Sequence, residues 1–262
     1  MHPLKPLPKV SVVIPLHDEA ACVEDNVARV TAYLEQTCNH YEVLLVDDGS
    51  TDDTNALCSG IVQRSHHIRL IRLDTNRGKG YAVRTGILNA TGEYILFTDA
   101  DLAVPIHFAD SCLSVLEGGA SVVIASRHRA ESTFRVQEGV CRRVLGELFR
   151  QFAKRVLHLG VSDITCGFKG FTQKAGLDIF SRSQINRWGY DAEILFLAQR
   201  LGYVVAEIPV DWYHSFDSKV RVVLDSFRTF WEICRVRYNA SAGLYDIRSA
   251  MEKQPSSVRQ SV

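Results

Sequence analysis

The sequence predicts an α/β fold in which a mostly parallel central sheet is flanked by helices. Short runs rich in β-branched residues alternate with longer segments of helical pattern through about residue 126. A chain of this kind returns by a helix to each next strand, which makes neighbouring strands parallel. The composition agrees, because 46% of the 262 residues are hydrophobic and 23% are charged, as in a globular domain.

The expected elements follow one another in strict order along the first half of the chain. Short apolar runs indicate buried strands at residues 10–16, 41–46, 68–73, 93–98 and 121–126. The segments between them are long enough for helices, at residues 19–37, 52–65, 79–90 and 106–117. Beyond Arg129, apolar residues at helical spacing predict two amphipathic helices, at 138–158 and about 219–237. We expect one domain over residues 1–240, followed by a polar tail over 241–262.

The charge balance and the cysteines exclude several classes of protein. With 30 Lys and Arg against 30 Asp and Glu, the formal net charge is zero, so we expect no nucleic acid partner. Residues 127–155 are nevertheless basic, with eight Arg or Lys against three Glu. The seven cysteines are scattered without a CxxC pair, which indicates a reducing compartment and no zinc site. No apolar stretch approaches the roughly 20 residues of a membrane helix, so we expect a cytoplasmic protein without a transmembrane segment.

Acidic side chains follow three of the predicted strands. They are Asp18 and Glu19 after the first strand, Asp47 and Asp48 after the second, and Asp99 and Asp101 after the fourth. Ligands of open α/β sheets bind beyond the carboxyl ends of the strands, where these side chains are expected to meet. Like charges gathered there require a cation or hydrogen-bond donors.

The D-x-D pair is the central observation. Asp99 and Asp101 leave an apolar strand two residues apart, which suits a hard divalent ion that binds oxygen and phosphate. The alternative is a helix cap or turn before Pro105. The nearby VDDGSTDDT favours the metal, because a capping box formed by Ser50 and Asp53 would leave Asp47 and Asp48 unexplained.

A glycine-rich stretch, NRGKGYAVRTG at 76–86, is neither a P-loop nor a dinucleotide fingerprint. The GxxxxGK[ST] pattern is absent, and Val83 stands where the third small residue of the fingerprint belongs. A turn that places Lys79 at the start of a helix still suits an anion. The alternative is a turn with a solvated lysine.

Seven motifs in order give a family resemblance over about residues 9–240. They are VSVVIPLHDE, LLVDDGSTDDT, NRGKGYAVRTG, FTDADLA, SR at 126–127, DITCGFKGF at 163–171 and RWGYDAEIL at 187–195. Together they resemble the inverting glycosyltransferases of family 2, which have the Rossmann-like GT-A fold, and specifically the dolichyl-phosphate β-glucosyltransferases. The combination of DADLA, D-x-x-CGFK and RW-x-x-D-x-E indicates the polyprenyl-phosphate branch.

This resemblance implies transfer of glucose from UDP-glucose to a polyprenyl phosphate. The implied donor nucleotide site consists of Pro15, Glu19, Asp47, Asp48, Lys79 and Asp99. The implied ligands of Mg²⁺ or Mn²⁺ are Asp99 and Asp101, which together with Arg127 and Asp191 form the catalytic set. Acceptor phosphate would be bound by Arg127, Arg143 and Lys169, and the sugar and acceptor pocket shaped by Asp163, Trp188 and Glu193.

The chain departs from its eukaryotic counterparts in one respect. They usually begin with a membrane helix, and this sequence has none, which favours a prokaryotic-type polyprenyl phosphate or peripheral attachment. The basic segment, from Arg127 through the 142–155 cluster, would then gather the anionic lipid at the cytoplasmic face of the membrane. The alternative for both amphipathic helices is ordinary packing with a solvated face.

The acceptor determines the chemistry that is required. A phosphate monoester has a second pKa of about 6 and is mostly dianionic at neutral pH. We therefore expect Asp191 to orient groups or balance charge rather than to act as an obligatory base, which an alcohol acceptor would need. Open alternatives are a GDP-mannose-dependent polyprenyl-phosphate mannosyltransferase, another UDP-sugar transferase of the same family, a sugar nucleotidyltransferase and a catalytically silent scaffold.

Overall fold

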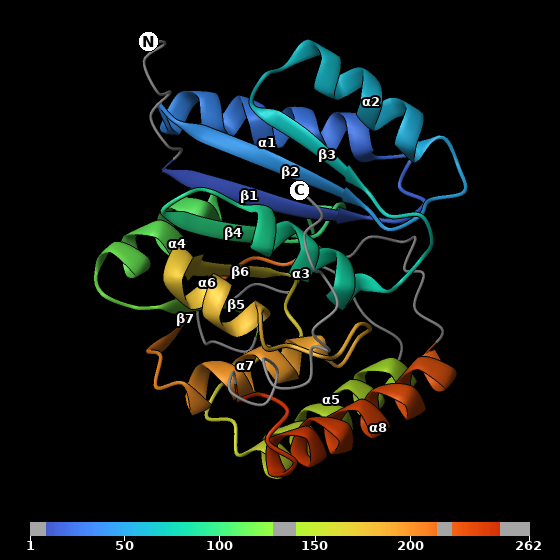
Figure 1. Cartoon of the computed structure of the whole chain (residues 1–262), viewed down its shortest axis with the longest axis vertical. Helices are drawn as coiled ribbons and strands as arrows, with labels where there is room; N and C mark the ends of the chain where they lie inside the picture. The colour runs from blue at the N-terminus through green and yellow to red at the C-terminus, as the bar shows by residue number, and fades with distance from the viewer. Residues whose placement is uncertain (1–8, 128–139, 214–221, 247–262) are drawn as a thin grey trace, which may run out of the picture.

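The computed structural model describes residues 9–127, 140–213 and 222–246, with backbone alone for 140–145 and 222–227. Within them a seven-stranded sheet has the order β3-β2-β1-β4-β6-β5-β7 (Figure 1). Its strands are β1 (Val10–Leu16), β2 (Tyr41–Asp47), β3 (Ile68–Arg72), β4 (Tyr94–Thr98), β5 (Val122–Ser126), β6 (Phe168–Thr172) and β7 (Val205–Pro209). Only β6 is antiparallel to its neighbours in this described sheet, which confirms the mostly parallel arrangement.

Helices cover both faces of the sheet. They are α1 (Val23–Thr37), α2 (Thr54–Arg64), α3 (Lys79–Asn89), α4 (Phe108–Glu117), α5 (Val140–Leu157), α6 (Gln173–Phe180), α7 (Tyr190–Arg200) and α8 (Val222–Ser241). The helix predicted at 219–237 thus continues to Ser241. Tyr245, in the stretch assigned to the polar tail, is 3% exposed.

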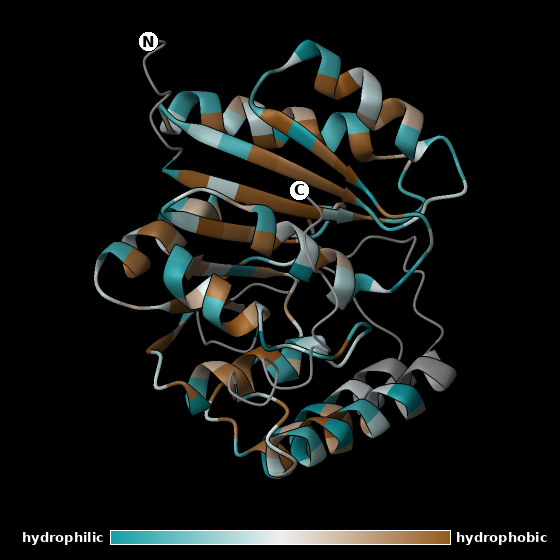
Figure 2. Ribbon diagram, viewed as in Figure 1, coloured by the Kyte–Doolittle hydropathy of each residue, from teal (hydrophilic) through white to brown (hydrophobic). Residues whose placement is uncertain are grey.

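The apolar strands have two buried faces, and each face builds its own core. Every residue of β1 and β2 is buried, as expected for central strands of a parallel sheet. Because side chains alternate along a strand, Val13 packs with α3, α6 and α7, whereas Val12 packs with α1 and α4. Figure 2 shows the hydrophobic colour concentrated on these central strands and on the helix faces turned toward them.

The late elements β6, α6, α7 and β7 were not predicted. The β6 run FKGFT contains a lysine and a glycine, so it lacks the apolar signal of the earlier strands. Its position depends on close packing, since a Cβ on Gly170 would overlap the Cys112 sulfur.

The helices α5 and α8 pack against each other through aromatic side chains. The centroid of the Phe230 ring lies 5.8 Å from that of Phe149 and 4.9 Å from that of Phe152. Among the described residues, no helix combines the length and apolar character needed to cross a bilayer.

Candidate active site

The predicted acidic residues lie at the edge where the parallel strands end. Leu16, the last residue of β1, is in register with Asp47 at the end of β2, and β4 lies on the other side of β1. Two non-glycine residues just beyond these strands have positive φ, Asp18 at 55° and Leu102 at 48°. Such strained backbone is costly and is concentrated at functional sites, so this edge is the candidate active site.

Asp47 and Asp48 hold the loops of this edge together. Asp47 accepts hydrogen bonds from the Ser50 backbone N–H at 2.9 Å and the Asn55 amide at 3.0 Å. Asp48 accepts from the backbone N–H groups of Arg77 and Gly78, both at 2.8 Å. Both carboxylates thus have structural partners that the sequence analysis missed.

The start of α2 does not form the capping box of Ser50 and Asp53 that the sequence allowed as an alternative. Asp53 occupies the N-cap position without a side-chain cap, and Asp52 accepts from the Thr54 N–H at 3.0 Å instead. Ser50 is used elsewhere, because its hydroxyl accepts from the Asp18 N–H at 3.0 Å. Glu19 is anchored beside it through its own N–H, which donates to the Thr54 hydroxyl at 2.7 Å. Pro15 is a buried residue of β1, paired with Val46.

Two lysine–carboxylate pairs flank the Phe97 ring. Lys79 Nζ lies 2.6 Å from Asp99 Oδ1, and Lys169 Nζ lies 2.6 Å from Asp191 Oδ1. Both ammonium groups are 5.7 Å from the centroid of the Phe97 ring. The structure therefore brings together four residues that were predicted from separate motifs.

The pKa shifts reflect this mixture of burial and charge. Burial alone would lower the pKa of Lys79, but the carboxylates of Asp99 and Asp191 raise it above its usual value. Burial raises the pKa of Asp191, against the opposing effect of Lys169 and Lys79. We infer that Lys79 stays charged near neutral pH.

The glycine of the CGFK motif is fitted against the D-x-D motif. A Cβ on Gly167 would overlap Asp99 Oδ2, so only glycine leaves room for this carboxylate. Cys166, the residue before it, is buried, and burial raises the pKa of its thiol to about 12. A neutral thiol of this kind is a poor nucleophile, and the Cys166 carbonyl instead accepts from Lys169 Nζ at 2.6 Å.

Arg127 leaves the end of β5 and is held by Asp163. Its Nε and Nη2 donate to the two oxygens of Asp163 at 2.8 and 3.1 Å, and Nη2 also donates to Thr165 Oγ1 at 2.9 Å. The Trp212 ring lies 5.5 Å from the guanidinium carbon. A bidentate pair with a carboxylate that is 1% exposed fixes the orientation of this guanidinium.

The remaining predicted residues have different environments. Trp188 is half-buried, and its ring centroid is 5.5 Å from Lys79 Nζ. Glu193 is fully buried and accepts from the N–H groups of Gln184 and Ile185, both at 2.9 Å, and from Tyr245 Oη at 2.7 Å. Its contacts support the turn before α7. Arg143 falls in α5, where its side chain lies outside the described atoms.

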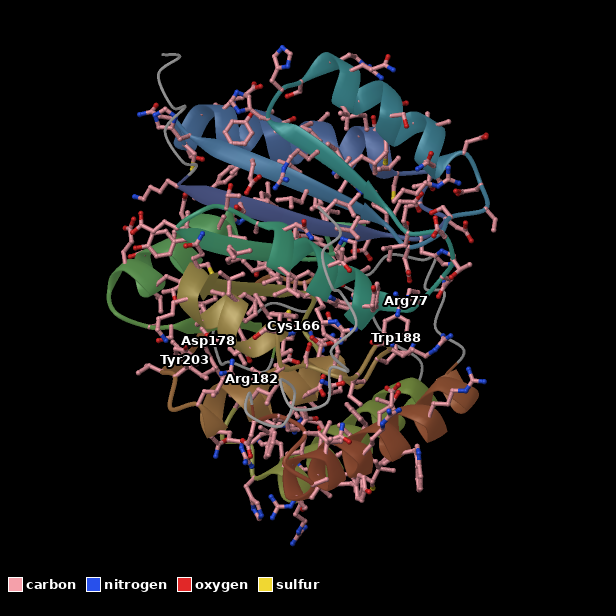
Figure 3. All side chains as sticks on the ribbon, viewed as in Figure 1. Arg77, Cys166, Asp178, Arg182, Trp188 and Tyr203 are labelled. Carbon is pink, nitrogen blue, oxygen red and sulfur yellow. The ribbon has the colours of Figure 1, made fainter. Side chains whose placement is uncertain are left out.

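A second polar cluster lies apart from this edge. In the view of Figure 3, Arg77 and Trp188 lie on one side, and Asp178, Arg182 and Tyr203 lie on the other. In the second cluster Lys174 Nζ is 3.0 Å from Asp178 Oδ2. Its members are joined to one another on the surface, so we do not include it in the site.

The described residues could bind a divalent ion only if a substrate supplied further ligands. No group of three His, Cys, Asp or Glu side chains in the described part of the chain could hold a metal on its own. Asp99 Oδ1 is a buried oxygen that lies 2.6 Å from Lys79 Nζ. Asp101 uses one oxygen to accept from the Ala103 N–H at 3.1 Å. Mg²⁺ commonly takes one or two carboxylates together with substrate phosphates, and this donor set fits that pattern.

The electrostatics of Asp101 are consistent with a cation ligand. Loss of surrounding water raises the pKa of its carboxyl, although the residue keeps exposed surface, and the negative charge of Asp99 raises it further. A nearby cation would relieve both effects. If a metal ion binds here, we therefore expect Asp99 and Asp101 to hold it.

Comparison with known proteins identifies relatives over most of the chain. The profile described as "Glycosyl transferase family 2" matches residues 11–180. A dolichyl-phosphate beta-glucosyltransferase of Dictyostelium discoideum is 32% identical over 252 residues, which is 92% of this chain and 77% of that protein. The dolichyl-phosphate beta-glucosyltransferase of Homo sapiens is 34% identical over 232 residues, covering 82% of this chain and 70% of that protein.

The fold is also similar to solved structures. Glucosyl-3-phosphoglycerate synthase from Mycobacterium tuberculosis, in complex with UDP, gives a TM-score of 0.61 at 21% identity, covering 90% of this chain and 80% of that chain. The same enzyme in complex with Mn²⁺, UDP-glucose and phosphoglyceric acid gives 0.62 at 20% identity, covering 90% and 80%. These likenesses support the predicted GT-A architecture.

Proposed function

Because this chain belongs to glycosyl transferase family 2, we propose that it transfers glucose from UDP-glucose to the phosphate of a polyprenol and inverts the anomeric configuration. The similarity to dolichyl-phosphate beta-glucosyltransferases over most of the chain is the observation that carries this proposal. The convergence of acidic, lysine and arginine side chains at one sheet edge supports it. We further propose that the protein acts at the cytoplasmic face of a membrane, where the lipid acceptor is available.

We propose that the donor side of the site binds a uridine diphosphate. Asp48 fixes the Arg77–Gly78 turn, which precedes Lys79 at the start of α3. The positive end of the α3 dipole and the Lys79 ammonium favour an anion. We assign the diphosphate to this position, with Pro15, Glu19, Asp47 and Asp48 on the nucleoside side.

Departure of UDP requires compensation of its developing negative charge. A divalent ion bound by Asp99 and Asp101 would supply Lewis-acid stabilisation of the diphosphate. Lys79 contributes a fixed positive charge to the same group, and Trp188 covers Lys79 with its ring. Asp191, held by Lys169, contributes negative charge that is suited to a sugar becoming positively charged at its anomeric carbon.

The acceptor side needs a cation but no strong base. The acceptor phosphate is already mostly dianionic at neutral pH and attacks without losing a proton. Arg127, oriented by Asp163, would bring this phosphate against the sugar and away from the donor carboxylates. Lys169 is fully buried and bonded to Asp191, so its effect on the acceptor would be indirect, through Asp191.

A transfer assay tests the proposal directly. The purified protein is incubated with radiolabelled UDP-glucose or GDP-mannose, a short polyprenyl phosphate, and Mg²⁺, Mn²⁺ or EDTA. We expect metal-dependent formation of a glucosylated lipid from UDP-glucose, and no product with the unphosphorylated polyprenol. Preference for GDP-mannose would show that UDP-glucose is not the donor. Transfer to the unphosphorylated polyprenol would show that the acceptor need not be a phosphate.

The metal assignment has its own control. Asp101→Ala is expected to abolish turnover while leaving the thermal unfolding temperature near that of the unchanged protein. Asp25→Asn is a matched control, because Asp25 is an exposed carboxylate in the first turn of α1. Near-normal turnover of Asp101→Ala would refute the role of this carboxylate.

A further inference from the structure

The α8 helix has an outward face in which arginine and aromatic side chains alternate. We define the α8 stripe as Arg228, Trp231, Arg235 and Tyr238. Their spacing of three, four and three residues places them on one side of a helix. Trp231 is 75% exposed and Tyr238 is 69% exposed, and both arginines are exposed as well. The opposite side of the helix is buried through Ile233 and Val236, so the stripe is the face that the described residues leave uncovered.

This combination of side chains has a specific chemical preference. Tryptophan and tyrosine have apolar rings with a polar group and favour the headgroup level of a bilayer. Arginine is attracted to anionic headgroups, and an amphipathic helix with both kinds of residue lies in the interface. Leu148 on the adjacent α5 is 55% exposed and adds apolar surface to the same pair of helices.

The charges disfavour a second copy of the chain as the occupant. The stripe contains two arginines and no acidic residue, so two copies facing each other would bring like charges together. The one acidic residue between its members, Glu232, is turned inward, where its Oε2 accepts from the Gly189 N–H at 2.7 Å. An anionic surface complements the stripe, and a copy of it does not.

We propose that the α8 stripe docks the chain on a bilayer surface that contains anionic lipids. The inference rests on the proposed function in one respect, because a lipid-borne acceptor makes such a surface the place of reaction. Figure 1 shows that α5 and α8 both begin on the side where the parallel strands end. Docking through α8 would therefore hold the acceptor side of the site close to the headgroups.

The same helix is connected to the donor site by a short path. Glu232 is next to Trp231 in the chain and binds the N–H of Gly189. Gly189 follows Trp188, whose ring is 5.5 Å from Lys79 Nζ. The turn at residues 188–189 therefore connects α8 with Lys79. This connection sets how the site faces a surface that binds the stripe.

Vesicle binding without any acceptor or donor tests the docking alone. Co-sedimentation is measured with vesicles of phosphatidylcholine and with vesicles that also contain phosphatidylglycerol. We expect binding to the anionic vesicles, with a loss of at least about tenfold in affinity for Trp231→Ser/Tyr238→Ser and for Arg228→Gln/Arg235→Gln. Matched controls are Val204→Ser, at a 60% exposed apolar residue away from α8, and Arg29→Gln on α1, and both should bind like the unchanged protein. Unimpaired binding of both stripe variants would overturn the inference.

A second measurement separates docking from the proposed function. With an acceptor embedded in anionic vesicles, Trp231→Ser/Tyr238→Ser should lose turnover, while turnover with a short soluble polyprenyl phosphate should be unchanged. If no sugar is transferred under any condition but the stripe still governs vesicle binding, the docking stands and the proposed function fails. If the unchanged protein forms a dimer in vesicle-free buffer that the stripe variants abolish, the stripe binds a second copy and the docking inference is wrong.

Discussion

Lys79 Nζ lies 2.6 Å from Asp99 Oδ1, so the first residue of α3 neutralises the first carboxylate of the D-x-D motif after β4. The pair is partly buried, with side-chain exposures of 22% and 28%. A divalent ion on Asp99 and the Lys79 ammonium would therefore act on the same carboxylate. Lys79 would counterbalance this charge before the donor binds and contact the diphosphate once it is bound.

We predict opposite effects of Lys79→Met on two ligands. Without the competing ammonium, the affinity of the donor-free protein for Mn²⁺ should rise, as measured by isothermal titration calorimetry. The KM for the donor should rise about tenfold or more, because a hydrogen bond to a charged group is lost. Lys174→Met is the matched control, since Lys174 also pairs with an aspartate but is 78% exposed and lies outside the site. If neither the Mn²⁺ affinity nor the donor KM changed in Lys79→Met, Lys79 would affect neither the metal nor the donor.

The pairing of Arg127 with Asp163 predicts an effect confined to the acceptor. Arg127→Ala should raise the acceptor KM by about tenfold or more, with a smaller change in the donor KM. Asp163→Asn should act in the same direction through loss of guanidinium orientation, because Asp163 touches Arg127 and is itself 1% exposed. Steady-state kinetics with each substrate varied separately measures both values.

A double-mutant cycle is the control for this pair. If Asp163 acts only by positioning Arg127, its substitution should add little to Arg127→Ala in the acceptor KM. Fully additive effects would assign Asp163 a separate role in the pocket. An acceptor KM that does not change in Arg127→Ala would remove Arg127 from the acceptor site.

The parts of the fold that were predicted share one physical basis. β1 and β2 are buried on both faces, so their sequences, VSVVIPL and YEVLLVD, are mostly apolar and identify them without knowledge of their neighbours. The strand ends then locate Asp47, Asp48, Asp99 and Asp101 at one edge, whatever the later topology. The glycine-rich turn before the third predicted helix pointed to Lys79 as an anion-binding residue, and the family resemblance added Arg127.

The parts that were missed depend on contacts between distant residues. Lys169 is tolerated inside β6 because Asp191, 22 residues later, pairs with it, and no local pattern reveals that partner. The sequence did not show that Asp47 and Asp48 also accept structural hydrogen bonds, from the Ser50 backbone N–H three residues on and from the Arg77 backbone N–H of a distant loop. Glu193 resembled a pocket residue in the RW-x-x-D-x-E motif, yet it is bonded to a buried turn and to Tyr245.

Glu193 also predicts a pH dependence of stability. Burial raises the pKa of this carboxyl above its usual value, against the lowering effect of its hydrogen bonds. Between the unfolded pKa and the higher folded pKa, the native state binds more protons, so stability falls as pH rises through that range. Glu193→Gln removes this titration and places an amide NH₂ group among hydrogen-bond donors that the carboxyl group accepts from. At low pH this substitution should lower the free energy of unfolding by about 1–3 kcal/mol.

Urea unfolding across the acidic to neutral range measures this effect. The difference in free energy of unfolding between the unchanged protein and Glu193→Gln should be largest below the unfolded pKa and should shrink as pH rises. Glu24→Gln, at an exposed residue of α1, should show no such trend beyond its surface pair with Arg64. A difference that grows with pH would mean that the folded pKa of Glu193 is lowered.

Gly167 offers the most specific test of how the site is assembled. Gly167→Ala should displace the Asp99 carboxylate, because the added Cβ would overlap Asp99 Oδ2, and turnover should fall far more than stability. Overpacking of this kind costs about 1–3 kcal/mol in stability. Gly146→Ala is the control, since a Cβ there has open space within α5, and the change should stabilise that helix by up to about 1 kcal/mol. Normal turnover and metal affinity in Gly167→Ala would show that Asp99 need not occupy this position for the reaction to proceed.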